Sequence, residues 1–269
     1  MASVIGVLVV HGIGIQKDDF AEDFISEMNN RLTDLQVAPD AVIWERAYWA
    51  DLLNDREANL WNDLSQDHDL DWVTVRKFFI NFFADAIAYQ RKLLANDDMY
   101  RQIHNRIHRH LANLRSNLGD QDKPLIIIAH SLGSVILSNY IWDEQQNKGL
   151  GTNPFERMET LASIVTFGSN IPLFTLALDE VECIQFPPNT LSPKLKTKAK
   201  WLNFFDGDDV LGYPLKPLSA SYRRTVTEDL QINTGGLFTS WNPISHTEYW
   251  TDNDFTKPVT QLIGDLVNA

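Results

Sequence analysis

Short apolar runs alternate with amphipathic segments along this chain. Residues 4–10 and 125–129 are almost wholly aliphatic, and such runs predict strands that are buried on both faces of a sheet. Residues 18–35 carry apolar side chains at helical spacing, which predicts an amphipathic helix. Further strands are predicted at 41–49, 161–167, 201–205 and 225–232, and a final helix at about 255–267. This alternation predicts an α/β fold with a mostly parallel central sheet flanked by helices on both faces.

The stretch from Asp51 to Asn117 has a helical pattern and contains no predicted strand. Its last part predicts a helix directly before the strand at 125–129, as the crossover between parallel strands requires. The earlier part, about 51–96, is rich in aromatic residues and longer than one crossover needs, so we expect a helical insertion before that strand. Two interpretations of the insertion are open: a cap over an apolar pocket, or ordinary helical packing or a dimer face.

The composition narrows the class of protein. Because 44% of the 269 residues are hydrophobic and no Pro/Gly/Ser-rich linker interrupts them, residues 1–269 are predicted to form a single domain. A net charge of −13 argues against nucleic-acid binding and against anionic membrane surfaces. The single cysteine, Cys183, excludes an intramolecular disulfide, and the apolar run at 4–10 is too short to span a bilayer. We therefore expect a cytoplasmic protein without a transmembrane segment.

Ser131 lies where a predicted buried strand turns directly into a predicted helix. The residues two positions before and after it, Ala129 and Gly133, are small. This arrangement is typical of a nucleophile elbow, in which the serine backbone takes a sparsely allowed conformation that larger neighbours would obstruct. Ala129 departs from the first glycine of the G-x-S-x-G pattern. The structural alternative is a buried strand followed by an ordinary serine N-cap.

A serine hydroxyl needs a base to remove its proton and an acid to orient that base. His246 follows the last predicted strand and precedes the final helix, which is a suitable position for the base. Three carboxylates follow the strand before that one, at Asp206, Asp208 and Asp209. We favour Asp209 as the acid, with Asp206 as the alternative and Asp208 third, because Asp209 lies within the loop and precedes an apolar, proline-containing segment.

Acyl transfer also requires donors for the oxyanion of the tetrahedral intermediate. The first predicted strand ends in His11, Gly12, Ile13 and Gly14, and glycines allow a backbone amide to approach a substrate closely. We assign one donor to the amide of Ile13, within this supporting loop, and the other to the amide of Leu132. The alternative, a phosphate-binding turn, lacks both the G-x-G-x-x-G pattern and a Walker lysine.

These motifs together resemble the α/β-hydrolase family, and in particular its lipase-like and esterase-like members. Residues 10–14 resemble the family's oxyanion-loop motif, and residues 129–133 resemble its nucleophile elbow. Asp209 and His246 match the positions that the later triad members take in the family. The resemblance covers the chain from residue 3 onward except the insertion. It implies a hydrolase without metal or organic cofactor, in which water resolves a covalent acyl-enzyme formed at Ser131.

The resulting hypothesis is an esterase or lipase-like serine hydrolase whose partner is a small acyl ester. A thioesterase, amidase or acyltransferase would use the same triad, and a non-catalytic binding protein of the same fold is a third interpretation. Acyl length, physiological substrate and oligomeric state are left open by the sequence. The histidines at 104, 108 and 110 lack the glutamate of an H-E-x-x-H zinc motif, so we interpret them as a solvated helix face and expect no metal site.

Overall fold

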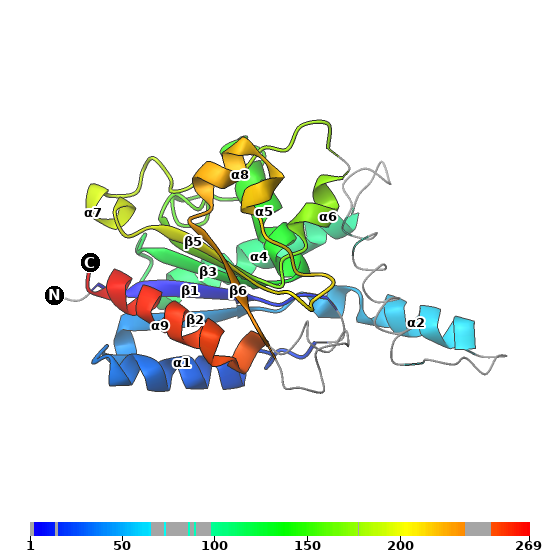
Figure 1. Cartoon of the computed structure of the whole chain (residues 1–269), viewed down its shortest axis with the longest axis horizontal. Helices are drawn as coiled ribbons and strands as arrows, with labels where there is room; N and C mark the ends of the chain where they lie inside the picture. Colours follow the sequence, from blue (N-terminus) through cyan, green and yellow to red (C-terminus); the bar gives the residue numbers. More distant parts are fainter. Residues whose placement is uncertain are drawn as a thin grey trace.

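The computed structural model describes residues 3–13, 16–65, 73, 86, 89, 98–176, 178–234 and 249–269. Its centre is a six-stranded sheet in the order β2-β1-β3-β4-β5-β6, and every neighbouring pair is parallel (Figure 1). The strands are β1 (Ile5–Val10), β2 (Val42–Ala47), β3 (Leu125–His130), β4 (Leu161–Phe167), β5 (Lys200–Asp206) and β6 (Glu228–Ile232). The predicted α/β class with a mostly parallel sheet is confirmed.

The three central strands are buried at every position, which is why their sequences read as continuous apolar runs. The outer strands β2 and β6 are only partly buried, and both contain charged residues. Strand β6 is shorter than predicted, because residues 220–225 form the short helix α8 (Ala220–Thr225) before it.

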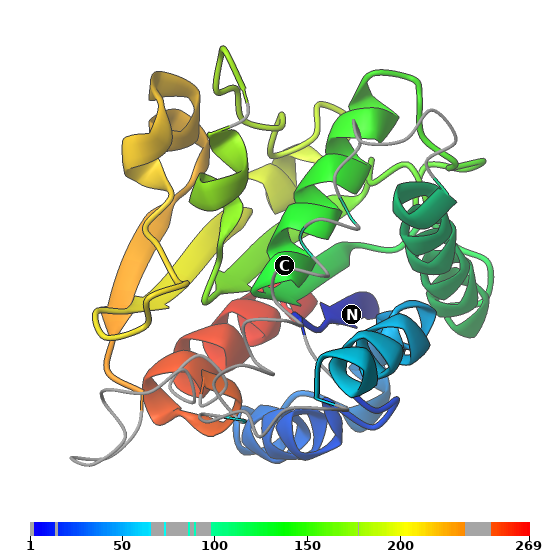
Figure 2. The same ribbon diagram turned by 90° about the vertical axis from the view of Figure 1, so that its right-hand side faces the viewer.

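Helices cover both faces of the sheet, as predicted. The helices α1 (Glu22–Asp34) and α9 (Asn253–Val267) pack on one face, and α4 (Asp98–Asn117) and α5 (Leu132–Gln145) pack on the other (Figures 1 and 2). Alternate residues of β1 serve the two cores: Val7 and Val9 contact the first layer, and Leu8 and Val10 contact the second. The shorter helices are η1 (Pro39–Ala41), η2 (Ala50–Leu52), α2 (Asn54–Ser65), α6 (Ile171–Thr175), α7 (Pro193–Lys196) and η3 (Lys216–Leu218).

The segment between β2 and β3 contains α2 and α4, and α2 projects away from the sheet (Figure 1). Much of the predicted insertion at 51–96 lies outside the described residues, so its role as a cap or an interface stays a prediction. One described residue ties it to the core: Tyr89 is buried, and its hydroxyl lies 2.8 Å from Nε2 of His104 on α4.

The interpretation of the three α4 histidines as a solvated face is wrong for His104. This side chain is buried and packs in a tilted contact against the ring of Tyr100, whose hydroxyl donates to Asp143 on α5. His110 is half-buried and pairs with Glu45 of β2 at 2.7 Å. The helix turns two of these rings toward the core and the sheet edge, which its apolar positions alone did not reveal.

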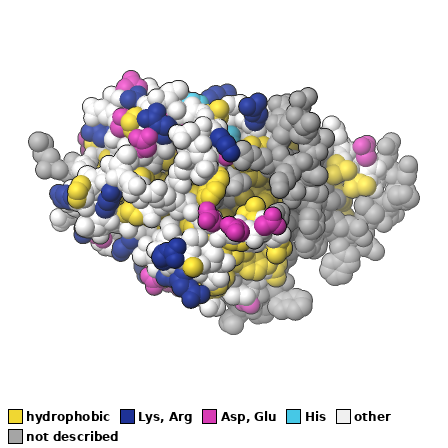
Figure 3. Space-filling model, turned by 90° about the horizontal axis from the view of Figure 1, so that it is seen from above, with side chains coloured by type: hydrophobic (Ala, Val, Ile, Leu, Met, Phe, Trp, Pro, Cys, Tyr) yellow, Lys and Arg dark blue, Asp and Glu magenta, His cyan; other side chains and the backbone are white. Residues whose placement is uncertain are grey.

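Two surface properties bear on the expected partners. Within the described part of the chain, no helix is long and apolar enough to cross a membrane. On the face shown in Figure 3, lysine and arginine side chains are scattered among acidic and apolar ones.

Candidate active site

Ser131 forms the sharp turn that the sequence predicted. It lies between the end of β3 and the start of α5, with φ +50° and ψ −125°, and it is fully buried. A residue other than glycine in such a conformation costs about 1–3 kcal/mol and persists only where its surroundings hold it. The Ser131 amide donates to the Phe167 carbonyl at 3.0 Å, which ties the turn to the end of β4.

The two glycine motifs of the sequence meet at this turn. A Cβ on Gly12 would lie 2.6 Å from Cβ and 3.2 Å from Oγ of Ser131. A Cβ on Gly133 would lie 2.5 Å from the His11 carbonyl oxygen. Only a residue without a side chain allows these close approaches, so the end of β1 and the first turn of α5 both depend on glycine here.

His11 holds the backbone at the end of β1. Its Nε2 accepts a hydrogen bond from the Trp49 amide at 3.1 Å, so its proton lies on Nδ1 and is directed at the Gly12 carbonyl at 2.7 Å. The ring stacks on Trp49, whose indole Nε1 donates to the His11 carbonyl at 3.2 Å. Burial lowers the pKa of His11 to about 4, so the ring is neutral at pH 7.

The two candidate acids after β5 have different surroundings. Asp206 accepts hydrogen bonds from the Asp208 amide and from the amide and hydroxyl of Thr234, at 2.6–2.8 Å. These bonds tie the end of β5 to the segment that follows β6. Asp209 accepts from the Leu211 amide at 2.9 Å through Oδ1. Both carboxylates are buried.

Tyr249 connects the two acidic positions. Its hydroxyl donates to Oδ2 of Asp209 at 2.8 Å and accepts from the Asp206 amide at 2.8 Å. Burial and the neighbouring Asp209 carboxylate raise the pKa of Tyr249 well above its ordinary value, so the hydroxyl keeps its proton. Sequence reasoning missed this residue, although its position three residues after His246 was a usable signal.

Two serines brace the turn from the side of α5. Ser134 Oγ donates to the Ser131 carbonyl at 2.5 Å and lies 2.8 Å from Oγ of Ser169, which follows β4. Tyr213, in the loop after Asp209, donates its amide to the Ser169 carbonyl at 3.0 Å. The ends of β3, β4 and β5 are therefore linked around Ser131.

The structure brings the glycine loop and the nucleophile turn together: Gly12 lies against Ser131, and Leu132 begins α5 directly after it. Asp206 is the last residue of β5, and Asp209 follows it in the next loop. His246 and Gly14 lie outside the described residues, so the base and the full oxyanion loop stay predictions. Across the ranges that the structure describes, no group of three His, Cys, Asp or Glu side chains could hold a metal ion.

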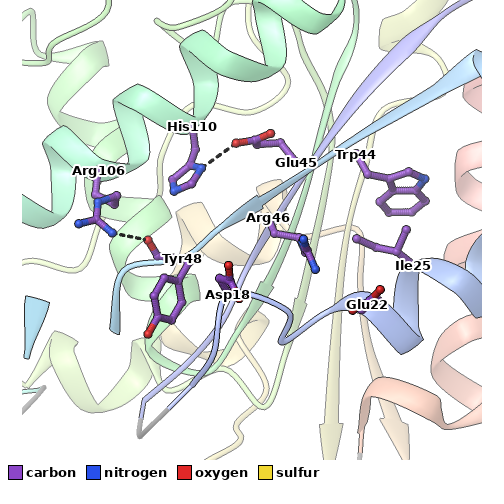
Figure 4. A pocket seen from close by; sticks show the side chains of 9 residues that line it. All are labelled: Asp18, Glu22, Ile25, Trp44, Glu45, Arg46, Tyr48, Arg106 and His110. Atoms are coloured by element: carbon purple, nitrogen blue, oxygen red, sulfur yellow. Dashed lines mark hydrogen bonds and ion pairs between the residues drawn. The ribbon is translucent and has the colours of Figure 1, made fainter. Parts of the chain in front are cut away.

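A cavity of about 540 Å³ lies elsewhere, along the outer edge of β2 between α1 and α4 (Figure 4). Ion pairs already occupy part of its lining: Arg106 binds Asp51 through both terminal nitrogens, and His110 binds Glu45. Residues Asp18, Glu22, Ile25, Trp44, Glu45, Arg46, Tyr48, Arg106 and His110 line it, so the cavity is separate from the serine turn.

No protein-family model matches the sequence, and no curated protein matches it. Among solved structures, the chain is similar to a dienelactone hydrolase from Anabaena variabilis at 13% identity and a TM-score of 0.44, with 98% of this chain and 85% of that chain covered. It is also similar to a structure from work on the metagenome-derived lipolytic enzymes LipS and LipT, at 14% identity and a TM-score of 0.45, with 99% and 94% covered. Similarities of this size carry no argument about activity.

Proposed function

We propose that this chain is a serine hydrolase that cleaves carboxylic esters. The proposal starts from the parallel sheet and the serine turn, which match the α/β-hydrolase fold. The observation that carries the proposal is the conformation of Ser131. Its backbone is held at positive φ between a buried strand and a helix, with Gly12 packed against its side chain. An ordinary serine N-cap has extended backbone and requires no such contact.

In the proposed mechanism Ser131 Oγ attacks the ester carbonyl while His246 removes its proton. His246 then gives this proton to the leaving alcohol, and an acyl group remains on Ser131. A water molecule, activated by His246, attacks the acyl group and releases the acid. In this second half the new C–O bond to water forms, the bond between the acyl carbon and Ser131 Oγ breaks, and His246 returns the proton taken from water to Oγ.

The proposed oxyanion donors are the amides of Leu132 and Ile13. Leu132 is the first residue of α5, so its amide belongs to the helix N-terminus, where backbone N–H groups lack partners within the helix. Ile13 follows Gly12, which lies against Ser131. His11 supports this proposal because its Nδ1 hydrogen bond restrains the carbonyl of Gly12, the residue before Ile13.

We propose Asp209 rather than Asp206 as the acid that orients His246. The bonds of Asp206 to Asp208 and Thr234 serve the ends of two strands. Asp209 instead binds Tyr249, which follows His246 by three residues. Tyr249, the first described residue after the proposed base in the sequence, is thus held on the proposed acid.

A small-molecule ester is the proposed substrate and the cytoplasm the proposed location. The acidic net charge of −13 favours neutral substrates over anionic ones. A panel of matched esters, thioesters and amides distinguishes an esterase from the enzymes that share this triad. We expect the highest kcat/KM with esters.

The direct test replaces Ser131 by alanine. We expect Ser131→Ala to lose hydrolysis of a short-chain activated ester by a factor of at least about 10⁴, and to lose labelling by a fluorophosphonate. Ser163→Ala is the matched control, because Ser163 is also fully buried but lies within β4. Undiminished turnover in folded Ser131→Ala would refute the proposed function.

The acid is tested with Asp209→Asn and Asp206→Asn. We expect Asp209→Asn to lower kcat by about 10³–10⁴ because His246 would lose its orienting carboxylate. Asp206→Asn should chiefly lower the free energy of unfolding, since three hydrogen bonds depend on that carboxylate. The reverse result would assign the acid to Asp206.

A further inference from the structure

Asn170 is a buried amide without a hydrogen-bond partner. The residue is fully buried, and neither Oδ1 nor Nδ2 of its side chain has a partner. Buried polar side chains in folded proteins are hydrogen-bonded in the large majority of cases. The amide of Asn170 therefore has donors and an acceptor that a bound group could satisfy.

Its place in the fold is beside the serine turn. Asn170 directly follows Ser169, whose hydroxyl contacts Ser134 in the first turn of α5. Three residues earlier, Phe167 accepts the hydrogen bond from the Ser131 amide. Tyr213, from the loop of the proposed acid, binds the Ser169 carbonyl. Asn170 thus belongs to a short segment that is hydrogen-bonded both to the first turn of α5 and to the loop of the proposed acid.

The neighbouring strand provides an instructive comparison. Asn203 on β5 is also fully buried, but each of its polar atoms is used. Its Nδ2 donates to Asp229 and to the Tyr213 carbonyl, and its Oδ1 accepts from Thr166, at 2.7–3.0 Å. The fold can therefore satisfy a buried asparagine in this region, and it does so at Asn203 but not at Asn170.

We infer that Asn170 is a substrate-positioning residue that binds a neutral hydroxyl or amide group on the substrate, a few atoms from the scissile ester. This inference rests on the proposed function. The side chain offers one acceptor and two donors, which match a group that both donates and accepts. A carboxylate substituent fits less well, because the net charge of the chain is −13.

A buried amide at this position would select among esters. A site with an unpaired buried amide rejects a substrate that leaves the amide unpaired, and accepts one that satisfies it. Hydroxylated or amide-bearing esters should therefore be better substrates than plain alkyl esters of the same size.

The experiment compares 4-nitrophenyl butyrate with 4-nitrophenyl 3-hydroxybutyrate, and propyl butyrate with 3-hydroxypropyl butyrate. These two pairs place the hydroxyl on the acyl side and on the alcohol side. For the wild type we expect the hydroxylated member of at least one pair to have a kcat/KM about tenfold or more higher. In Asn170→Leu, which has similar size but no polar atoms, that ratio should fall to about one.

Asn203→Leu is the matched control for stability. It should lower the midpoint of thermal unfolding by about 5 °C or more, because Asp229 and Thr166 each lose their hydrogen bond to the Asn203 side chain. Asn170→Leu should leave the midpoint unchanged or raise it, since no partner is lost. Equal destabilisation by both substitutions would show that Asn170 is a structural group and would overturn the inference.

An unchanged ratio in folded Asn170→Leu would also overturn the inference, whatever the total activity. Failure of the proposed function has a different signature: hydrolysis of the esters would survive in Ser131→Ala, or the wild type would neither hydrolyse them nor react with a fluorophosphonate. In that second case the stability comparison still decides whether Asn170 is structural.

Discussion

Replacing Tyr249 by phenylalanine removes one oxygen atom from the centre of the proposed acid loop. The hydroxyl donates to the Asp209 carboxylate and accepts from the buried Asp206 amide. A hydrogen bond to a charged group contributes about 1.5–3 kcal/mol, and the amide bond adds about 1 kcal/mol. Because Tyr249 is fully buried, water does not replace these bonds. We expect Tyr249→Phe to lower the free energy of unfolding by about 3 kcal/mol.

The assay for this variant combines urea unfolding with steady-state kinetics. If Asp209 orients His246, a misplaced carboxylate should also lower kcat by about 10–100-fold. Tyr213→Phe is the matched control, because its hydroxyl binds the Val210 carbonyl at an exposed position of the same loop. We expect that control to change stability by less than about 1 kcal/mol, without an effect on kcat. Unaltered kcat in a destabilised Tyr249→Phe would refute the link between this hydroxyl and catalysis.

Two further predictions concern the oxyanion loop. Gly12→Ala should lower kcat by about 10²–10³, because the new methyl group collides with Ser131. The control Gly264→Ala should retain full activity, because its new methyl group makes only ordinary contacts in α9. Equal activity of the two variants would count against the packing of Gly12 on Ser131. The second prediction uses His11, whose pKa falls from 6.5 unfolded to about 4 folded, so acid protonates the unfolded chain first and stability declines from pH 6.5 toward pH 4. The wild type should lose about 3 kcal/mol of unfolding free energy between pH 6.5 and pH 4. In urea titrations, the difference in unfolding free energy between wild type and His11→Asn should shrink by this amount over the same pH range. A difference that does not change with pH would contradict the buried neutral ring.

Much of the fold could be predicted from local pattern. The apolar runs of β1, β3 and β4 identified buried parallel strands, because such strands have no solvent-facing side to mark with polar residues. The helical spacing of 18–35 and of the C-terminal segment located α1 and α9 within a few residues. Periodicity was less informative for the partly buried β6, where a short helix precedes the strand.

The sequence likewise predicted one part of the candidate site but not the buried contacts around it. Ser131 and its small neighbours were predictable because a strand, a sharp turn and a helix are consecutive in the sequence. The buried position of His104 was not, because its partners Tyr89 and Asp143 come from segments outside α4. Its place in the helix is compatible with either a buried or an exposed face.

The sequence alone determined the strand and helix pattern, the turn at Ser131 and the order of the candidate groups along the chain. These properties depend on neighbouring residues, and the periodicity of side chains records them directly. Only the tertiary structure decided that Gly12 lies against Ser131, that Tyr249 links Asp206 to Asp209, and that Asn170 has no partner. Each of these facts depends on chain segments that meet through the sheet, and one amino-acid sequence does not encode such distances in any local pattern.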